Sequence, residues 1–462
     1  MKKNRIFRPY DLDQQYLLPP DMKEWLPADH LVYMVLDVVE TLDLSVILNG
    51  YEGSHKGRRP YDPRMMVALL LYGYAVGVRS SRKLEQATYD QLSFRILTAD
   101  QHPDHDTIAD FRSRNLDFLD DLFLQSIRLC MKAGLVKLGH ISIDGSKVKA
   151  NASKHKSMSY SHMEREEQRL KEDIASMIEE AKTIDIEEDA KYGKGKRADE
   201  LPEELKNREQ RLKKIREAKK ALEKEAEEKA KAKKKERVLS DQKLVEEGKK
   251  PRDKKKISVK PESKAQRNFT DPDSRIMKNG ANKAFEYSYN AQIAVDDKDQ
   301  VIVAAAVSQV GNDYAELIPL VKQIKENVGD NPRKASADTG YYSEENMSFL
   351  EEEGIDAYVS VKRESHGVAP PMAPKGRTPH GFSKKQLMAR KLRTKKGKET
   401  YARRKAIVEP VFGQIKECRG MRAFLLRGHK KVSAEWSLCA AVHNLLKLVK
   451  SQAAPEQSVA WA

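Results

Sequence analysis

Cysteine is scarce in this chain, and long hydrophobic runs are missing. Its three cysteines, Cys130, Cys418 and Cys439, are widely spaced among 462 residues and form no Cys-x-x-Cys pair. They therefore indicate neither a zinc site nor a disulfide framework. The apolar run at 65–76 is too short to span a bilayer, and the basic N-terminal stretch lacks the apolar segment of a signal peptide. We expect a cytoplasmic protein with no membrane segment.

Positive charge, by contrast, is in excess, and the excess is local. The chain has a formal net charge of +16, but residues 361–462 alone contain 23 Lys and Arg against 6 Asp and Glu. The preceding 360 residues are therefore close to neutral. A basic segment of this kind is the electrostatic footprint of a nucleic-acid-binding surface. We expect a polyanionic partner, and the C-terminal quarter is the part that would contact it.

The first 135 residues read as helices joined by short turns. Asp62 followed by Pro63 is a typical helix start, with a capping carboxylate and then proline at the first helical position. Helices of this size suit a helix-turn-helix-like DNA-binding unit. A helical bundle with no role in nucleic-acid binding fits the same residues, and the pattern alone leaves both interpretations open.

A highly charged stretch interrupts the middle of the chain. Residues 161–260 hold 31 Lys and Arg and 26 Asp and Glu, so their charges nearly cancel. Apolar residues recur at helical spacing first around Leu170 and Ile174 and then around Leu212, Ile215 and Leu222, which predicts an antiparallel helical hairpin or coiled coil. We expect a solvated arm that could support dimerisation. The basic runs at 230–237 and 249–256 are predicted to be loose linkers.

The rest of the chain alternates strands and helices. A strand at 139–150 carries Asp144, and a β-hairpin follows at 285–308. Asn312 or Asp313 is expected to cap the next helix, and a short strand then ends at Asp338. A further strand lies at 355–361, residues 362–400 read as a flexible basic loop, and a basic helix covers 401–416. This order fits a mixed sheet with helices on both faces, as in the RNase H-like fold.

Three carboxylates lie on three separate elements of this core. Asp144 is on the polar side of an alternating strand that otherwise looks buried, Asp338 is at a strand end, and Glu409 stands in a strongly basic helix. A buried carboxylate is costly unless it is paired or binds a metal ion. Each also has an ordinary structural interpretation, such as a turn or a helix entry. Three other acids are alternative candidates: Asp296, Glu344 and Glu345. Glu344 and Glu345 also suit the first turn of a helix, where the helix dipole favours negative charge.

The motifs around these carboxylates resemble those of bacterial insertion-sequence DDE transposases. The stretches Ile-Asp-Gly-Ser at 143–146 and Ala-Asp-Thr-Gly-Tyr-Tyr at 337–342 look like the first and second catalytic motifs of that family. The C-terminal helix has the family's spacing of two residues between Tyr401 and Arg404 and of six between Glu409 and Lys416. Four residues separate Arg404 from Glu409, where the family pattern has three. Three basic residues therefore remain candidates for the family's arginine: Arg403, Arg404 and Lys405.

The resemblance implies an α/β RNase H-like mixed-sheet core that is interrupted by a helical insertion and preceded by an all-α N-terminal domain. Residues 1–135 would form the helical DNA-end-binding domain, because residues 103–114 resemble the segment that precedes the catalytic core in this family. The catalytic core would comprise 136–156 and 266–450. Residues 157–265 would be the inserted hairpin, and 451–462 a flexible tail.

The resemblance also implies a function. Asp144, Asp338 and Glu409 would bind two Mg²⁺ or Mn²⁺ ions and catalyse cleavage at the element's ends and strand transfer to target DNA. The partner would be double-stranded DNA, both terminal inverted repeats and target, bound by a homodimer or larger assembly. An RNase H-like nuclease without strand transfer and an inactive DNA-binding descendant of a transposase remain alternatives. The expected DNA contacts come from six residues: Tyr401, Arg403, Arg404, Lys405, Lys416 and Arg275.

Overall fold

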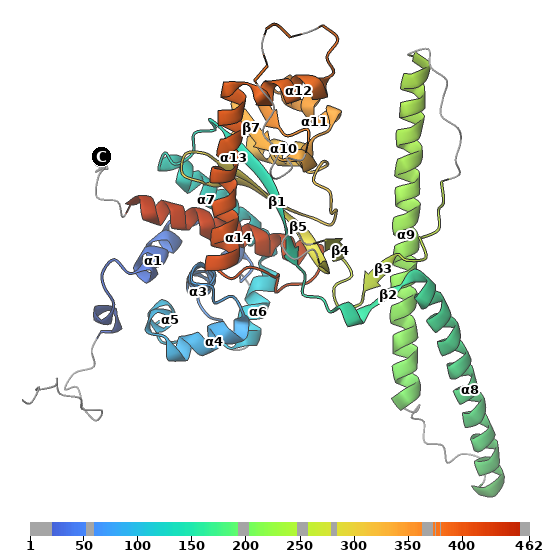
Figure 1. Cartoon of the computed structure of the whole chain (residues 1–462). Coiled ribbons are helices and arrows are strands. Elements are labelled where there is room, and N and C mark those ends of the chain that lie inside the picture. The colour runs from blue at the N-terminus through green and yellow to red at the C-terminus, as the bar shows by residue number, and fades with distance from the viewer. Residues whose placement is uncertain are drawn as a thin grey trace, which may run out of the picture.

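The computed structural model describes most of the chain and places three parts in space (Figure 1). The parts are a set of N-terminal helices, a central sheet with helices against it, and a long two-helix arm that stands away from both. The structure describes these residues: 21–51, 60–192, 203–246, 257–278, 284–362, 373–374, 376–378 and 380–452.

The N-terminal part is helical, as the turn and cap residues predict. The carboxylate of Asp62 accepts a hydrogen bond from the backbone N–H of Arg64 at 2.8 Å, and Pro63 is the first helical residue of α3. After a short 3₁₀ turn at Met22–Trp25, the helices are α1 (Leu31–Thr41), α2 (Ser45–Asn49), α3 (Pro63–Ala75), α4 (Ser81–Asp90), α5 (Leu92–Leu97), α6 (His105–Arg114) and α7 (Leu116–Lys132).

The sheet has the mixed topology expected from the sequence. Its strands are β1 (Ile141–Lys149), β4 (Arg275–Lys278), β5 (Phe285–Asp296), β6 (Ile302–Ser308), β7 (Lys334–Ala337) and β8 (Asp356–Val359). Strand β5 pairs antiparallel with β1 on one side and with β4 and β6 on the other, whereas β1, β7 and β8 run parallel. An antiparallel hairpin followed by parallel strands on the far side of β1 is the RNase H-like arrangement, so the predicted fold class is confirmed.

Both faces of the sheet are buried. Ile143, Ala294 and Ala337 belong to a core cluster on the face covered by α10 (Leu317–Val328) and α11 (Glu344–Glu352). Ile293 and Val408 belong to a second cluster, on the face covered by α13 (Lys395–Gly413) and α14 (His429–Gln452). Because neighbouring strand residues point to opposite faces, Asp144, which follows Ile143, faces α13.

The N-terminal helices share a hydrophobic core with the sheet. The cluster that contains Val408 and Trp436 also contains residues of α1, α3, α5 and α7. Asn444 of α14 joins these parts by donating to Ser126 Oγ of α7 at 3.2 Å and to the carbonyl of Ile302 in β6 at 2.9 Å. The helices α1–α7 are therefore packed against the sheet through α14.

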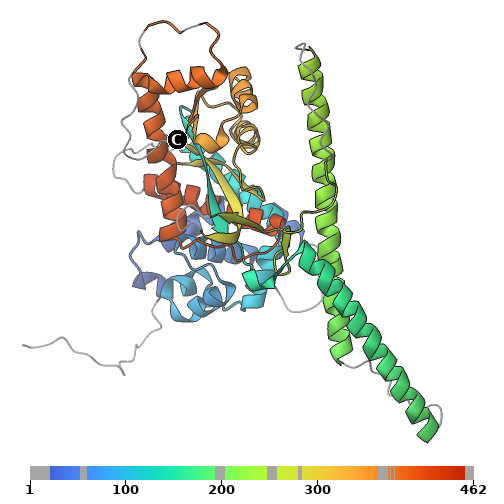
Figure 2. The ribbon, with the colours of Figure 1, turned by 45° about the vertical axis from the view of Figure 1, so that its right-hand side comes forward.

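The inserted arm is an antiparallel pair of long helices, seen from two directions in Figures 1 and 2. Helix α8 (Tyr160–Tyr192) packs on α9 (Glu203–Glu246) around buried Leu170, Leu212 and Ile215. At its base, β2 (Ser157–Ser159) pairs with β3 (Gln266–Asn268). The expectation of a loose linker at 230–237 is wrong, because these residues are helical within α9; the run at 249–256 lies outside the described residues.

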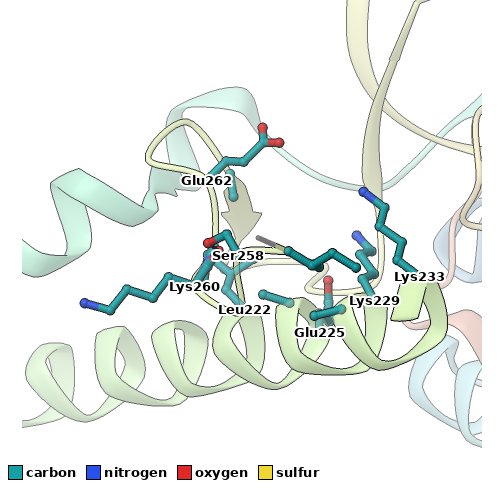
Figure 3. A pocket seen from close by; sticks show the side chains of 12 residues that line it. Leu222, Glu225, Lys229, Lys233, Ser258, Lys260 and Glu262 are labelled. Carbon is teal, nitrogen blue, oxygen red and sulfur yellow. Dashed lines mark hydrogen bonds between the residues drawn. The ribbon is translucent and has the colours of Figure 1, made fainter. Parts of the chain in front are cut away.

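A groove of about 590 Å³ lies between α9 and the chain at 257–265 (Figure 3). Glu225, at its edge, accepts from Arg267 at 2.6 Å and from Arg275 at 2.8 Å, which ties the arm to β3 and β4. This groove is on the arm, whereas the carboxylates predicted to be catalytic are on the sheet and α13.

The basic segment before α13 is more ordered than its composition suggests. Ser383 and Gln386 form a reciprocal capping box that starts α12 (Lys384–Arg393), and α13 begins two residues later. The prediction of a flexible loop is therefore wrong for 383–400. Residues 363–372 of that loop, and 453–462 of the predicted tail, lie outside the described residues.

Candidate catalytic site

Asp144 lies in the middle of β1, under helix α13. Its Oδ2 is 3.3 Å from Nη1 of Arg404, and its Oδ1 accepts from the backbone N–H of Gly145 at 2.9 Å. The Asp144 side chain retains 23% of its exposed area and that of Arg404 9%, so the pair is largely removed from water. Ser142, two residues earlier on the same face, donates to the carbonyl of Arg404 at 3.3 Å.

Burial raises the pKa of Asp144 to about 6, despite the opposing charge of Arg404. The neighbouring carboxylates of Asp338 and Asp313 raise it further. Desolvation and like charges both disfavour the ionised form of a carboxylate. One arginine does not compensate fully for this concentration of negative charge, so a cation is the species that would stabilise it best.

Asp338 follows β7 directly and lies at the end of the strand next to Asp144. The parallel register pairs Ile143 with Ala337, which brings the next residues of the two strands to the same edge. Oδ1 of Asp338 accepts from the backbone N–H of Gly340 at 2.8 Å and so fixes the turn after the strand. Carboxyl ends of parallel strands are where open α/β sheets bind their ligands.

Glu409 lies on α13, the helix that also carries Arg404, and it is exposed. The pKa of Arg404 shows how the charges are arranged: burial lowers it, but the neighbouring Asp144, Tyr401, Asp338 and Glu409 outweigh that effect and raise it. All three carboxylates predicted from the sequence therefore act on one buried guanidinium.

Lys416 lies beside Asp144 because α13 changes its winding. After Gly413 the chain forms a π-helical turn, Gln414–Cys418, a feature often found at functional sites. The ammonium of Lys416 donates to the hydroxyl of Ser146, two residues beyond Asp144 on β1. Burial lowers the pKa of Lys416, while Glu417 and Asp144 oppose that effect.

The basic residues around Glu409 differ in their surroundings. Arg404 is the one that contacts Asp144, and its guanidinium carbon lies 5.7 Å from the centre of the Tyr401 ring. Arg403 instead pairs with Asp297 in the β5–β6 turn at 2.9 Å, and Lys405 is exposed. The structure thus places Arg404, of the three candidates, at the carboxylates.

Other residues singled out in the sequence have structural partners. Arg275 donates to Glu225 on the arm and to the carbonyl of Pro272 at 2.8 Å. Asp296 is fully buried and accepts from the backbone N–H of Leu138 at 3.0 Å. Glu344 and Glu345 lie in the first turn of α11, which Ser343 caps. These positions explain the three rival acids without a catalytic role.

The oxygen atoms that the site offers are of the kind that bind a divalent cation. Carboxylate oxygens are the ligands that Mg²⁺ and Mn²⁺ prefer, and Asp144 in β1 lies beside Asp338 at the end of the neighbouring strand β7. Within the described ranges, no three His, Cys, Asp or Glu side chains are grouped closely enough to hold a metal ion. Glu409 is exposed on the facing helix, so its carboxylate would have to turn toward the other two to complete a set of three.

The prediction that Asn312 or Asp313 caps the next helix was wrong, and the sequence analysis did not predict the polar network around Asp313. Helix α10 begins at Leu317 with Glu316 as its N-cap, so Asp313 does not cap it. Its Oδ1 instead accepts from Asn290 at 2.6 Å and from Gln292 at 2.8 Å. A signal was present, because Asn290 and Gln292 are alternate polar residues in a strand whose other face is apolar at Ala291 and Ile293.

The sheet order defines an RNase H-like fold, with Asp144 and Asp338 on neighbouring strands. Two family models match the chain: "Transposase DDE domain" over residues 253–445 and "Transposase domain (DUF772)" over residues 20–114. Together they cover more than half of the sequence. The chain belongs to the insertion-sequence-type DDE transposases, as its motifs suggested.

Two of the three candidate carboxylates lie within a matched range, and the third does not. Asp338 and Glu409 lie within the DDE-domain match, and Asp144 lies between the two matched segments. In the other two comparisons, no curated protein and no solved structure matches. A search of the helices in the described part of the chain finds none that is both long and apolar enough to cross a membrane.

Proposed function

We propose that this DDE transposase cleaves DNA at the ends of its insertion sequence and joins the freed ends to target DNA. The observation that carries the proposal is that Asp144, within β1, lies beside Asp338 at the end of the neighbouring strand β7, with Arg404 of the Glu409-bearing helix held against Asp144 at 3.3 Å. The raised pKa of Asp144 supports a role as a cation ligand. Asp144, Asp338 and Glu409 would hold divalent ions, which when bound activate the attacking oxygen and stabilise the leaving one.

The residues of the chain itself would position the DNA. Arg404, which is buried, and Lys416, which is half-buried, are cations beside Asp144 and would hold the phosphate that reacts, since charge-assisted hydrogen bonds to phosphate are short and strong. Tyr401, adjacent to Arg404, offers a ring on which a displaced base can stack. Water attack at the element's end breaks one phosphodiester bond and leaves a 3′-hydroxyl. That hydroxyl attacks a target phosphodiester, so one bond forms as another breaks.

The remaining predictions belong to the same proposal. Lys405 and Arg403 are on the outer side of α13 and would contact the DNA backbone. The helices α1–α7 would bind the terminal inverted repeats. A homodimer or a larger assembly would bring the two ends of the insertion sequence together. Arg275, whose guanidinium is bound to Glu225, is better assigned to holding the arm than to DNA.

The test is the variant Glu409→Gln beside the matched control Glu399→Gln, which changes an exposed acid on the same helix. We expect Glu409→Gln to lower cleavage by more than about 100-fold, as loss of a metal ligand should exceed the loss from its supporting partners, and to bind end DNA as the wild type does. Glu399→Gln should behave as the wild type in both assays. Equal loss of cleavage and binding in Glu409→Gln would reject the ligand role, and cleavage without joined products would mean a nuclease without strand transfer.

A further inference from the structure

Behind the catalytic face of the sheet lies a second polar centre built on Asp313. Its Oδ1 accepts three hydrogen bonds: from Lys147 at 3.2 Å, from Asn290 at 2.6 Å and from Gln292 at 2.8 Å. Three donors on one oxygen is unusual for a side chain in a loop. Asn290 and Gln292 are fully buried, and the Asp313 side chain retains 21% of its exposed area.

This centre reaches the strand of Asp144 from the opposite side. Lys147 and Gly145 alternate with Asp144 along β1, so they point to the other face, where their strand partners are Asn290 and Gln292. The Gln292 amide lies directly over Gly145: a Cβ at that glycine would be 2.2 Å from Nε2 of Gln292. The backbone on which Asp144 stands is therefore packed against an amide that Asp313 holds.

The same centre reaches the turn after Asp338. The hydroxyl of Tyr341 donates to Oε1 of Gln292, so the Gln292 amide is bound at both ends. Oδ2 of Asp313 and Oδ1 of Asp338 lie 3.2 and 3.0 Å from the position that a Cβ on Gly340 would take. Asp313 is thus bonded to the strand of Asp144 through Lys147 and lies close to the turn after Asp338.

We propose that Asp313 is a positioning residue of the catalytic centre, which fixes the strand of Asp144 and the turn of Asp338 relative to each other through Lys147, Gln292 and Tyr341. The inference rests on the proposed function, because it assigns Asp313 to the geometry of that site. Supporting residues around a metal site typically change metal affinity or activity by about 10–100-fold when they are lost.

The test measures Mn²⁺ binding by calorimetry, together with cleavage of end DNA, in Asp313→Ala and Asp313→Asn. We expect Asp313→Ala to weaken Mn²⁺ binding by about 10–100-fold. Asp313→Asn should weaken it less, because an amide oxygen still accepts from Asn290 and Gln292 but lacks the charge that holds Lys147. The control Asp330→Asn removes an exposed acid just after α10 and should bind Mn²⁺ as the wild type does.

A second variant, Tyr341→Phe, removes the hydrogen bond from the Tyr341 hydroxyl to Gln292 and leaves Asp313 unchanged. We expect it to weaken Mn²⁺ binding, and its effect should not add fully to that of Asp313→Asn, because both act through Gln292. Lower thermal stability with unchanged Mn²⁺ affinity in the folded Asp313 variants would overturn the inference and mean a purely structural role. A wild type that binds Mn²⁺ but does not cleave would reject the proposed function while leaving the binding comparison decisive for Asp313.

Discussion

The charge of Asp144 should destabilise the metal-free protein, and its removal should stabilise it. Burial raises the pKa of Asp144 from 3.8 to about 6, so ionising it in the folded chain costs about 3 kcal/mol more than in the unfolded chain. The cost is absent below pH 3.8, where both states are protonated, and complete above pH 6, where both are ionised. Asp144→Asn should therefore raise the free energy of unfolding at pH 7.5 by up to about 3 kcal/mol.

The gain of about 3 kcal/mol is an upper limit, because Asp144→Asn also changes the hydrogen-bond partner of Arg404. Its Nε is already buried without a hydrogen-bond partner among the described residues, and Nη1 would exchange a carboxylate for an amide oxygen. The assay is thermal unfolding in EDTA between pH 4 and pH 8, with Asp330→Asn as the control for loss of an acid elsewhere. We expect the variant to melt several degrees above the wild type at pH 7.5 and within about a degree of it at pH 4.

Two outcomes would refute the reasoning. One is an Asp144→Asn variant that is less stable than the wild type at pH 7.5. The other is a stability difference that stays the same from pH 4 to pH 8, which would mean that ionisation of Asp144 is not its source. Excess Mn²⁺ should narrow the difference at pH 7.5, because it stabilises the wild type through the site that the variant lacks.

Three further predictions concern the surroundings of the site. Gly145→Ala should lower stability by about 1–3 kcal/mol, since its Cβ would meet the Gln292 amide at 2.2 Å; Gln292→Ser should restore part of the loss in thermal unfolding, and an alanine variant as stable as the wild type would contradict the packing. Lys405→Ala should weaken binding to all DNA sequences alike and reduce the salt slope by about 1; a sequence-dependent loss would assign Lys405 to base recognition instead. Glu435→Ala should cost about 3–5 kcal/mol, because it removes the fully buried charge partner of Arg79 and the acceptor of the Leu425 and Leu426 backbone N–H groups; a loss under 1 kcal/mol in denaturant unfolding would show that this buried carboxylate contributes little.

Much of the catalytic core could be predicted because its signals are local. The alternation of β1 and β5, the Asp338 turn and the spacing from Tyr401 to Lys416 each depend on a few neighbouring residues. Those patterns were sufficient for the RNase H-like topology, which the sheet order confirms. The family resemblance supplied the link among the three carboxylates, which stays a prediction, whereas the matches to transposase domains confirm the family.

The parts that failed depend on contacts between distant segments. Asp313 has the sequence of a helix cap, but Lys147, Asn290 and Gln292 are donors brought to it by the sheet. The helix that starts after Ser383 is an exception, because its capping box with Gln386 is a local signal that the basic composition of 383–400 outweighed. The choice of Arg404 over Arg403 also required the fold, because it depends on which face of α13 meets β1.

The predicted domain boundaries can be compared with the packing of the structure. The boundary predicted near residue 135 falls in the loop before β1, but a single hydrophobic cluster extends across it. The predicted end of the insertion at 265 coincides with the base formed by β2 and β3. The division into a DNA-end-binding part, a catalytic core and an inserted arm therefore remains a proposal, in which the first two parts would move as one.

The measurement that tests the central claim most directly uses DNA carrying the ends that flank the gene, incubated with the protein and Mg²⁺ or Mn²⁺. Wild type and Asp144→Ala would be compared for nicked and joined products, with DNA binding measured on the same samples. The account predicts metal-dependent cleavage and joining by the wild type, and neither by the variant at equal DNA binding. Products of equal yield from Asp144→Ala, or binding by the wild type without cleavage under either metal, would contradict it.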